Sequence, residues 1–197
     1  MSAQTRLILA SGSPRRRQLL TEAGIPFDAV VPTIGEPDEV MNKLPPTQQA
    51  EALAYFKARA VHDQYPSRWV LGADTIVARG GKLLGKPQDA AEARGTLAAL
   101  AGTRHAVITG VVLLGPTGRL IASETTFVTM RKLSPAELEE YIASGQWQGK
   151  AGAYGLQEIG DRFVEKVEGS FSNVVGLPME LLARMIDQII PKGGKKG

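Results

Sequence analysis

The sequence contains no cysteine, and this absence excludes disulfides, thiolate metal sites and cysteine nucleophiles. A chain without cysteine is compatible with a reducing compartment. Long hydrophobic runs are absent as well. The first apolar run, Leu7–Ala10, is too short for the core of a signal peptide, and no stretch approaches the roughly 20 apolar residues of a membrane span. We therefore expect a cytoplasmic protein with no membrane partner.

The sequence has almost no excess of positive charge outside its last residues. The formal net charge is +3, from 23 Lys and Arg against 20 Asp and Glu. Residues 191–197 hold three of the lysines and no acid, so residues 1–190 balance 20 basic against 20 acidic side chains. A neutral body does not match the clustered cations that bind a nucleic-acid backbone, so we expect no nucleic-acid partner. The Gly- and Lys-rich residues 191–197 predict a flexible basic tail.

With 197 residues and 43% hydrophobic side chains, the chain can bury a normal core, which we place in a single domain, residues 1–190. Strand-like and helix-like segments alternate, which predicts an α/β (mixed α+β) fold. The predicted strands are 7–10, 29–31, 69–78, 82–84, 105–114 and 120–130. The predicted helices are 14–23, 47–64, 89–100, 135–144 and 178–190.

Three of these helices begin with capping signals. Ser13-Pro14 and Ser134-Pro135 place a good N-cap before the residue type favoured in the first helical turn. Asp89, three residues before Glu92, forms an acidic version of the capping box.

Two ionisable residues lie where the pattern calls for apolar ones. Asp74 is in the middle of the almost wholly apolar strand 69–78, where an unpartnered carboxylate would be very costly. A metal or catalytic role is the stronger interpretation, and a carboxylate that caps a nearby helix is the alternative. Lys57 interrupts the apolar stripe of helix 47–64. Periodicity leaves open whether its ammonium reaches solvent at the stripe edge or points into a cleft.

A turn of small and basic residues follows the first predicted strand. It reads Ser11-Gly12-Ser13-Pro14-Arg15-Arg16-Arg17. The N–H groups and positive helix end of such a turn suit a phosphate, and arginine guanidinium groups match phosphate oxygens. Three solvated arginines on a helix surface are an equally good interpretation. The chain has no Walker A motif, which excludes P-loop chemistry.

Other polar features carry weaker signals. Lys86 stands on a stiff turn between Gly85 and Pro87, and residues 149–155 form a Gly-rich loop. The two histidines, His62 and His105, are not linked by any metal-binding spacing, so we expect both to be structural.

A set of short motifs runs along nearly the whole chain. They are LASGSPRR at 9–16, KA at 57–58, GADTIV at 72–77, GKP at 85–87, GTRH at 102–105 with TG at 109–110, KAGAYGLQ at 150–157 and GSFSNVVGLP at 169–178. Taken together, these segments resemble the Maf family. The motifs follow the family's order, and the set is highly specific although no single motif is decisive.

The resemblance implies a two-lobed fold around a long mixed sheet, related to the inosine triphosphatases, with a nucleotide cleft between the lobes. It also implies a house-cleaning nucleoside triphosphate pyrophosphatase that requires Mg²⁺ or Mn²⁺, forms homodimers in some members and has been linked to cell division arrest. The catalytic residues it implies are Asp74, Lys57 and Lys86, with Asp74 and Glu36 as candidate metal ligands. The phosphate-binding residues it implies are Ser11, Ser13, Arg15 and Arg16.

Three positions distinguish two branches of the family, and here they hold Arg15, Thr75 and Gln157. The branch that prefers 7-methylguanosine triphosphate tends to carry Trp, Gln and Glu, which suit a cationic base by stacking and charge. A Gln amide can donate to a uracil-type carbonyl and accept from the ring N–H. The resemblance therefore favours dTTP and UTP, with CTP or modified pyrimidines as further substrates and the methylated purine as the alternative.

The chain departs from the family pattern at two places. Gly35-Glu36 stands where the family often has Asp-Glu, and Glu158 stands where glycine is usual, so a metal or water ligand and the base pocket are affected. A nucleotide-binding regulator without turnover is a rival from another functional class. The ionisable residues in apolar settings favour an enzyme.

Overall fold

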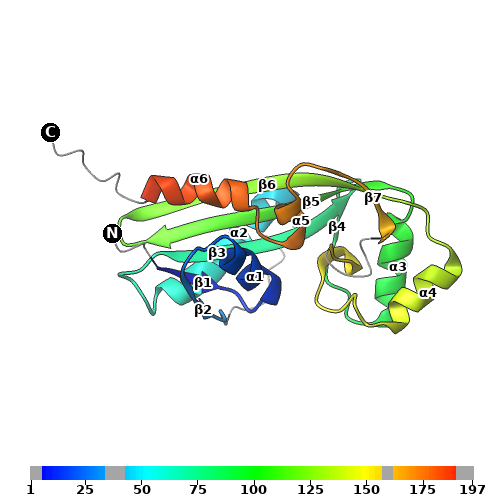
Figure 1. The fold of residues 1–197 in the computed structure, drawn as a ribbon, viewed down its shortest axis with the longest axis horizontal. Helices are drawn as coiled ribbons and strands as arrows, with labels where there is room; N and C mark the ends of the chain where they lie inside the picture. Colours follow the sequence, from blue (N-terminus) through cyan, green and yellow to red (C-terminus); the bar gives the residue numbers. More distant parts are fainter. Residues whose placement is uncertain (1–5, 34–42, 157–161, 190–197) are drawn as a thin grey trace.

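The computed structural model describes residues 6–33, 43–156 and 162–189. Its centre is a seven-stranded mixed sheet in the order β2-β1-β3-β5-β6-β7, with β4 paired to part of β3 (Figure 1). The strands are β1 (Leu7–Ala10), β2 (Phe27–Val30), β3 (Val70–Arg79), β4 (Lys82–Leu84), β5 (Arg104–Gly115), β6 (Gly118–Met130) and β7 (Val164–Glu168). The helices are α1 (Pro14–Glu22), α2 (Pro46–His62), α3 (Ala90–Leu100), α4 (Pro135–Ala143), the 3-10 helix η2 (Ala151–Ala153), α5 (Phe171–Val175) and α6 (Met179–Ile189).

The long antiparallel strands β3, β5 and β6 form the spine of the molecule. β3 pairs with β5 from Val70 opposite Leu114 to Ala78 opposite Ala106. Helices α1, α2 and α6 lie toward one end of this spine with β1 and β2, whereas α3, α4 and η2 lie at the other end (Figure 1). This is the two-lobed arrangement around a long mixed sheet that the resemblance implied.

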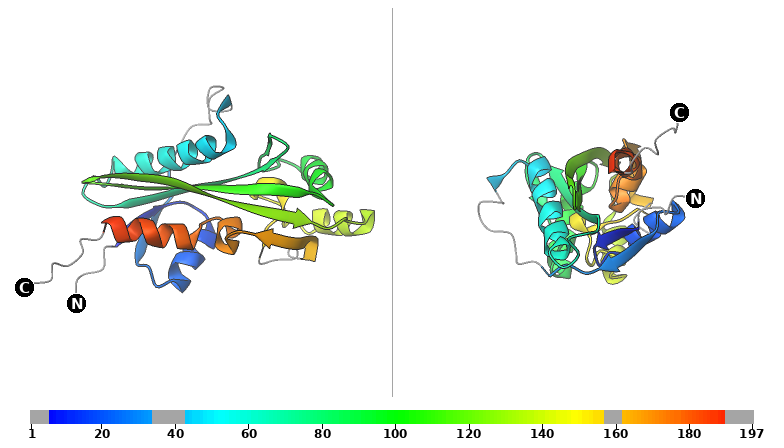
Figure 2. Two further views of the ribbon diagram at one scale, coloured as in Figure 1. Left: turned by 90° about the horizontal axis from the view of Figure 1, so that it is seen from above. Right: turned by 90° about the vertical axis from the view of Figure 1, so that its left-hand side faces the viewer.

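Helices cover both faces of the sheet, with α2 on one face and α1 and α6 on the other (Figure 2). In β1, Ile8 packs in the core cluster that holds residues of α2, whereas Leu7 and Leu9 pack in the cluster that holds residues of α1 and α6. Side chains alternate between the faces of a strand because its period is two. Consecutive residues of β3, such as Asp74 and Thr75, therefore face opposite sides.

Helix α2 lies unusually close to the sheet. A Cβ atom on Gly72 would be 2.3 Å from the carbonyl oxygen of Ala54, and one on Gly110 would be 2.3 Å from that of Ala50. Ala50 and Ala54 are one turn apart and therefore lie on the same helix face. Small residues on both surfaces let the helix backbone approach β3 and β5, which fixes the position of the α2 side chains over β3.

The predicted strands and helices are confirmed, and each begins and ends within two residues of its predicted bounds. Ser13 caps α1, and Ser134 with Glu137 forms a capping box at α4. Asp89 caps α3 as expected, but the Glu92 carboxylate accepts from the N–H of Gln88.

Sequence reasoning missed β7 and α5. Each has five residues, and their stability comes from tertiary contacts rather than from a periodic pattern. None of the described helices combines the length and apolarity needed to cross a membrane. The expected tail, 191–197, lies outside the described residues.

Candidate active site

The sheet is incomplete along one edge of β3. β1 pairs with Val70–Gly72 and β4 pairs with Val77–Arg79, both on the edge opposite β5. Among the strands that the structure describes, none pairs with residues 73–76 on this edge. β1 also lies between β2 and β3, so its carboxyl end is a topological switch point, where α/β sheets commonly bind ligands. Asp74 lies within residues 73–76, the part of β3 that is unpaired on this edge among the described strands.

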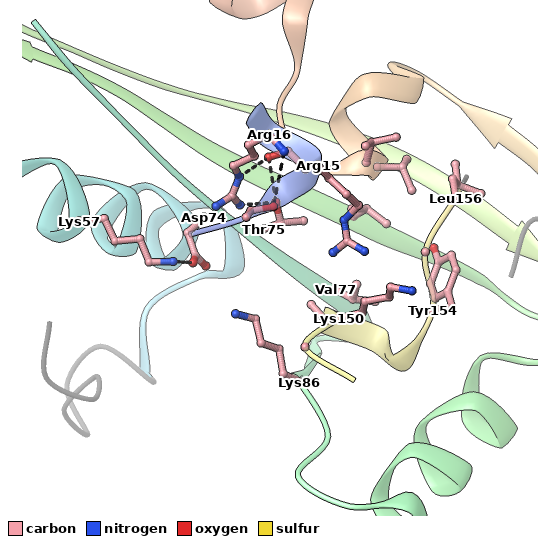
Figure 3. Close-up of a pocket in the computed structure, with 18 residues that line it drawn as sticks. Arg15, Arg16, Lys57, Asp74, Thr75, Val77, Lys86, Lys150, Tyr154 and Leu156 are labelled. Carbon is pink, nitrogen blue, oxygen red and sulfur yellow. Dashed lines mark hydrogen bonds and ion pairs between the residues drawn. The ribbon is translucent and has the colours of Figure 1, made fainter. Parts of the chain in front are cut away.

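A pocket opens at this part of β3, between the two lobes (Figure 3). The start of α1, β3 and α2 supply one part of its wall, and the loop 149–156, Lys86 and the end of α5 supply the rest. The polar lining residues are Ser13, Arg15, Arg16, Lys57, Asp74, Thr75, Lys86, Lys150 and Tyr154. The apolar ones are Val77, Val107, Ala151, Leu156, Val174 and Val175.

A second hollow continues from this pocket along the β1–α1 turn. It shares several cationic lining residues with the first and extends to Ser11, Gly12, Val31 and Pro32. The two together form an elongated cleft, with cations where they meet and an apolar wall at one end.

The pocket is strongly cationic. Within the described residues, its lining carries one carboxylate, Asp74, and five cationic side chains: Arg15, Arg16, Lys57, Lys86 and Lys150. So many like charges in one cavity repel each other unless an anion joins them. Arginine and lysine side chains bind phosphate oxygens well. The lining therefore fits a ligand that carries several negative charges, although the chain as a whole is close to neutral.

Asp74 and Lys57 form an ion pair in the pocket. Their side chains are only 12% and 17% exposed. Burial lowers the pKa of the Lys57 ammonium, and the nearby Asp74 carboxylate opposes this by raising it. The structure thus decides the question that periodicity left open, because Lys57 reaches from α2 into the cleft. The described partner of Asp74 is this lysine rather than a helix N-terminus.

The three consecutive arginines have three different environments. Arg17 is exposed, as expected for a solvated helix surface. Arg15 is partly buried and points its guanidinium into the pocket (Figure 3). Arg16 is only 8% exposed, and burial lowers the pKa of its guanidinium while nearby Asp74 raises it. The interpretation of three solvated arginines is therefore wrong for Arg15 and Arg16.

The buried Arg16 side chain ties the β1–α1 turn to two other segments. Its Nε donates to the carbonyl oxygen of Gly176 at 2.8 Å, and its Nη2 donates to Thr75 Oγ1 at 3.1 Å. Its Nη1 donates to Ser11 Oγ at 3.2 Å. Ser11 Oγ also accepts from the Ser13 N–H at 3.1 Å, which holds the turn before α1 in shape.

The structure brings eight of the ten predicted site residues to this cleft: Ser11, Ser13, Arg15, Arg16, Lys57, Asp74, Thr75 and Lys86. The other two, Glu36 and Gln157, lie outside the described residues, as do Gly35 and Glu158. The described residues hold no group of three His, Cys, Asp or Glu side chains that could bind a metal by themselves.

Sequence reasoning did not assign the loop 149–156 to the site. Lys150 and Tyr154 both line the pocket and are nearly fully buried. Gly152, at φ +72, lets the loop lie against β3, because a Cβ there would be 2.9 Å from the Val77 side chain. The sequence signal for this part of the site was a Lys and a Tyr inside a Gly-rich loop. It was not sufficient, because the loop reaches the pocket only by packing on β3, which is distant in the sequence.

His105 supports the pocket wall from behind. Its Nε2 lies 2.7 Å from the Tyr154 hydroxyl oxygen. Burial lowers the pKa of His105 to about 4 and raises that of the Tyr154 hydroxyl, so both groups are neutral at pH 7. This environment agrees with the structural role expected for His105.

The model of the family described as Maf-like protein matches residues 6–189. The chain belongs to the Maf family. A protein named dTTP/UTP pyrophosphatase from Deinococcus radiodurans is 45% identical over 188 residues, which are 94% of this Maf chain and 95% of the relative. A protein of the same name from Symbiobacterium thermophilum is 44% identical over 182 residues, covering 92% and 93% of the two chains.

Two solved structures share the fold of this Maf chain. A HAM1 protein from Coxiella burnetii aligns with a TM-score of 0.52 and 16% identity, covering 93% of this chain and 99% of that one. The Staphylococcus aureus Ham1 protein aligns with a TM-score of 0.51 and 11% identity, again over 93% and 99%. The predicted fold class is confirmed.

Proposed function

We propose that this Maf-family chain is a nucleoside triphosphate pyrophosphatase that hydrolyses dTTP and UTP to the monophosphate and pyrophosphate. The observation that carries this proposal is the pocket in which one carboxylate, Asp74, lies among five cationic side chains at the open edge of β3. The names of the relatives, which share more than two fifths of their residues with this chain, support the choice of substrate.

A divalent metal fits this lining. Mg²⁺ in phosphate-transfer sites is usually held by one or two carboxylates together with the substrate's own phosphates. The described pocket offers one such ligand, Asp74, and Glu36 is the candidate for a second. These residues suit a Mg²⁺ or Mn²⁺ that binds with the triphosphate. When bound, the metal would neutralise part of the negative charge on the phosphates.

The protein side chains have separate roles in the reaction. Asp74 orients a water molecule for attack on the α-phosphorus and accepts its proton. The bond from the α-phosphorus to the bridging oxygen breaks, and pyrophosphate leaves with the electron pair. Lys57 stabilises the Asp74 carboxylate. Lys86 and Arg16 stabilise negative charge on the leaving group, because such transfers depend mainly on positioning and electrostatics.

The character of the lining also favours a pyrimidine over a cationic methylated purine. The apolar wall suits the face of a base, whereas Arg15 and Lys150 stand beside it in the same pocket. A base that is itself positively charged would be repelled by these cations. The carbonyl oxygens of uracil and thymine are acceptors, which cationic donors can bind.

The proposal is tested by measuring pyrophosphate release from dTTP, UTP, CTP, GTP, ATP and 7-methyl-GTP. We expect dTTP and UTP to be the best substrates, with 7-methyl-GTP poor. Addition of a chelator should abolish release, and Mg²⁺ or Mn²⁺ should restore it, because the pocket lining supplies too few ligands to retain a metal alone. Preference for 7-methyl-GTP would contradict the substrate assignment. Nucleotide binding without any release would favour the regulator instead.

A further inference from the structure

Thr109 of β5 is a fully buried threonine whose hydroxyl contacts a pocket residue. It lies directly opposite Thr75 of β3, and the two Oγ1 atoms are 2.9 Å apart. Both side chains face the side of the sheet that carries α1 and α5. A buried hydroxyl is normally hydrogen-bonded, so this pair alone does not imply a function. The surrounding hydrogen bonds indicate more, because they connect Thr109 through Thr75 to Arg16 in the pocket.

The shortest of these hydrogen bonds can all be made in one direction. A guanidinium can only donate, and Arg16 Nη2 donates to Thr75 Oγ1 at 3.1 Å. A backbone carbonyl can only accept, and Thr109 Oγ1 donates to the carbonyl oxygen of Asn173 at 3.2 Å. Thr75 and Thr109 have one hydroxyl proton each. The two shortest contacts open to these protons, 2.9 Å between the hydroxyls and 3.2 Å from Thr109 to Asn173, are both satisfied when Thr75 donates to Thr109, whereas the carbonyl oxygen of Gly176 lies 3.4 Å from Thr75 Oγ1. This chain of hydrogen bonds, called the relay below, runs from Arg16 through Thr75 and Thr109 to the backbone carbonyl of Asn173.

The far end of this relay is rigidly held. The side chain of Asn173, fully buried, donates from Nδ2 to the Val107 carbonyl oxygen and to Thr126 Oγ1, both at 3.0 Å. Its backbone N–H donates to Ser170 Oγ at 3.2 Å, at the cap of α5. The acceptor that ends the relay is thus fixed to β5, β6 and α5 at once.

The near end of the relay is the Arg16 guanidinium, which interacts with Asp74 only through space and whose described hydrogen-bond acceptors are all neutral. Arg16 donates to two hydroxyls and one carbonyl, all uncharged. Within the part of the chain that the structure describes, no carboxylate forms a salt bridge with it. Three of its five N–H groups are used in these contacts, and the guanidinium lines the pocket. Its orientation therefore depends on neutral partners, of which Thr75 is one.

We propose that Thr109 is a positioning residue, which fixes Arg16 through Thr75 for binding of the substrate's triphosphate. This inference rests on the proposed function, because it assigns Arg16 to the triphosphate. Without the Thr109 hydroxyl, the proton of Thr75 has no partner at 2.9 Å. Its other described acceptor, the carbonyl oxygen of Gly176, is farther away, at 3.4 Å. Thr75 then turns, and the guanidinium loses a fixed acceptor.

Two substitutions separate positioning from packing. Thr109→Val keeps the shape of the side chain and removes the hydroxyl, whereas Thr109→Ser keeps the hydroxyl and removes a buried methyl. For Thr109→Val we expect kcat/KM for dTTP to fall about tenfold, the factor that corresponds to one neutral hydrogen bond. Thr109→Ser should retain a near wild-type kcat/KM although it unfolds at lower denaturant concentration. A purely structural role predicts that activity follows stability in both variants.

A second measurement observes Arg16 without relying on catalysis. Its Nε–H resonance in a ¹⁵N correlation spectrum can be assigned by its loss in Arg16→Lys. The resonance should shift or broaden in Thr109→Val and stay in place in Thr109→Ser. If Val cannot be accommodated, Thr109→Ala also removes the hydroxyl and gives the same readings.

The outcomes distinguish this inference from the proposed function. Wild-type kcat/KM together with an unchanged Arg16 resonance in Thr109→Val would overturn the positioning role. A wild-type protein that releases no pyrophosphate from any nucleotide would contradict the proposed function instead. The resonance would then still decide whether Thr109 positions Arg16, with a shift supporting it and an unchanged signal overturning it.

Discussion

An Asp74→Asn protein is expected to fold and to lose about a thousandfold in kcat, within the range for removal of a general base. The amide has nearly the same volume as the carboxylate, so the packing of β3 against α2 is kept. It carries no negative charge and cannot accept a proton from water. The substitution therefore removes both the proposed base and the proposed metal ligand. The measurement is the rate of pyrophosphate release from dTTP at saturating metal.

The control for this variant addresses Lys57, which loses its partner in Asp74→Asn. Removing one member of a buried ion pair can cost about 3–5 kcal/mol, because the other charge is left uncompensated. A double variant, Asp74→Asn with Lys57→Met, removes both charges and should recover much of that stability. It should remain inactive if Asp74 performs the chemistry. A folded Asp74→Asn protein with substantial activity would rule out the assigned role.

Replacement of Gly110 by alanine should destabilise the protein by about 3 kcal/mol, at the upper end of ordinary overpacking. The new Cβ would lie 2.3 Å from the Ala50 carbonyl oxygen, and backbone atoms cannot move away as a flexible side chain can. The helix must lift from the sheet, and this displaces Lys57 from Asp74. We therefore expect a lower unfolding midpoint in urea and a lower rate of pyrophosphate release.

Gly95 provides the matched control. It is exposed on α3, and a Cβ there would meet nothing within 4 Å. Gly95→Ala should therefore stabilise the protein by about 0.5–1 kcal/mol, the difference in helix propensity between the two residues. A Gly110→Ala protein as stable as Gly95→Ala would show that α2 does not depend on this close approach.

Features carried by a single local segment could be predicted from the sequence. Asp74 is one charge in an apolar strand, and its need for a partner follows from the cost of burial alone. The helix starts at Ser13 and Ser134 follow from the capping residues, whose hydrogen bonds span three positions. These inferences do not depend on how distant segments pack.

Features set by packing between distant segments could not be predicted in the same way. Successive helical residues point about 100° apart, so local sequence cannot say which of Arg15, Arg16 and Arg17 is buried. The choice depends on Gly176, which lies 160 residues away from Arg16 along the chain. Lys57 was ambiguous for the same reason, because the contact of α2 with Gly72 sets its direction.

The relay through Thr109 shows the same limit. A threonine in a strand is ordinary β-sheet composition and gives no local signal of a role. Its partners come from β3 and α5, and only the register of β3 with β5 places Thr75 opposite it. The motifs of the Maf resemblance span these residues, but they do not state which atoms meet.

Hydrolysis of dTTP in ¹⁸O-labelled water identifies the phosphorus that water attacks. We expect attack at the α-phosphorus, so mass spectrometry should find one ¹⁸O in the thymidine monophosphate and none in the pyrophosphate at the moment of release. Label in the pyrophosphate, or release of orthophosphate and thymidine diphosphate, would contradict the proposed pyrophosphatase reaction, because attack would then fall on another phosphorus.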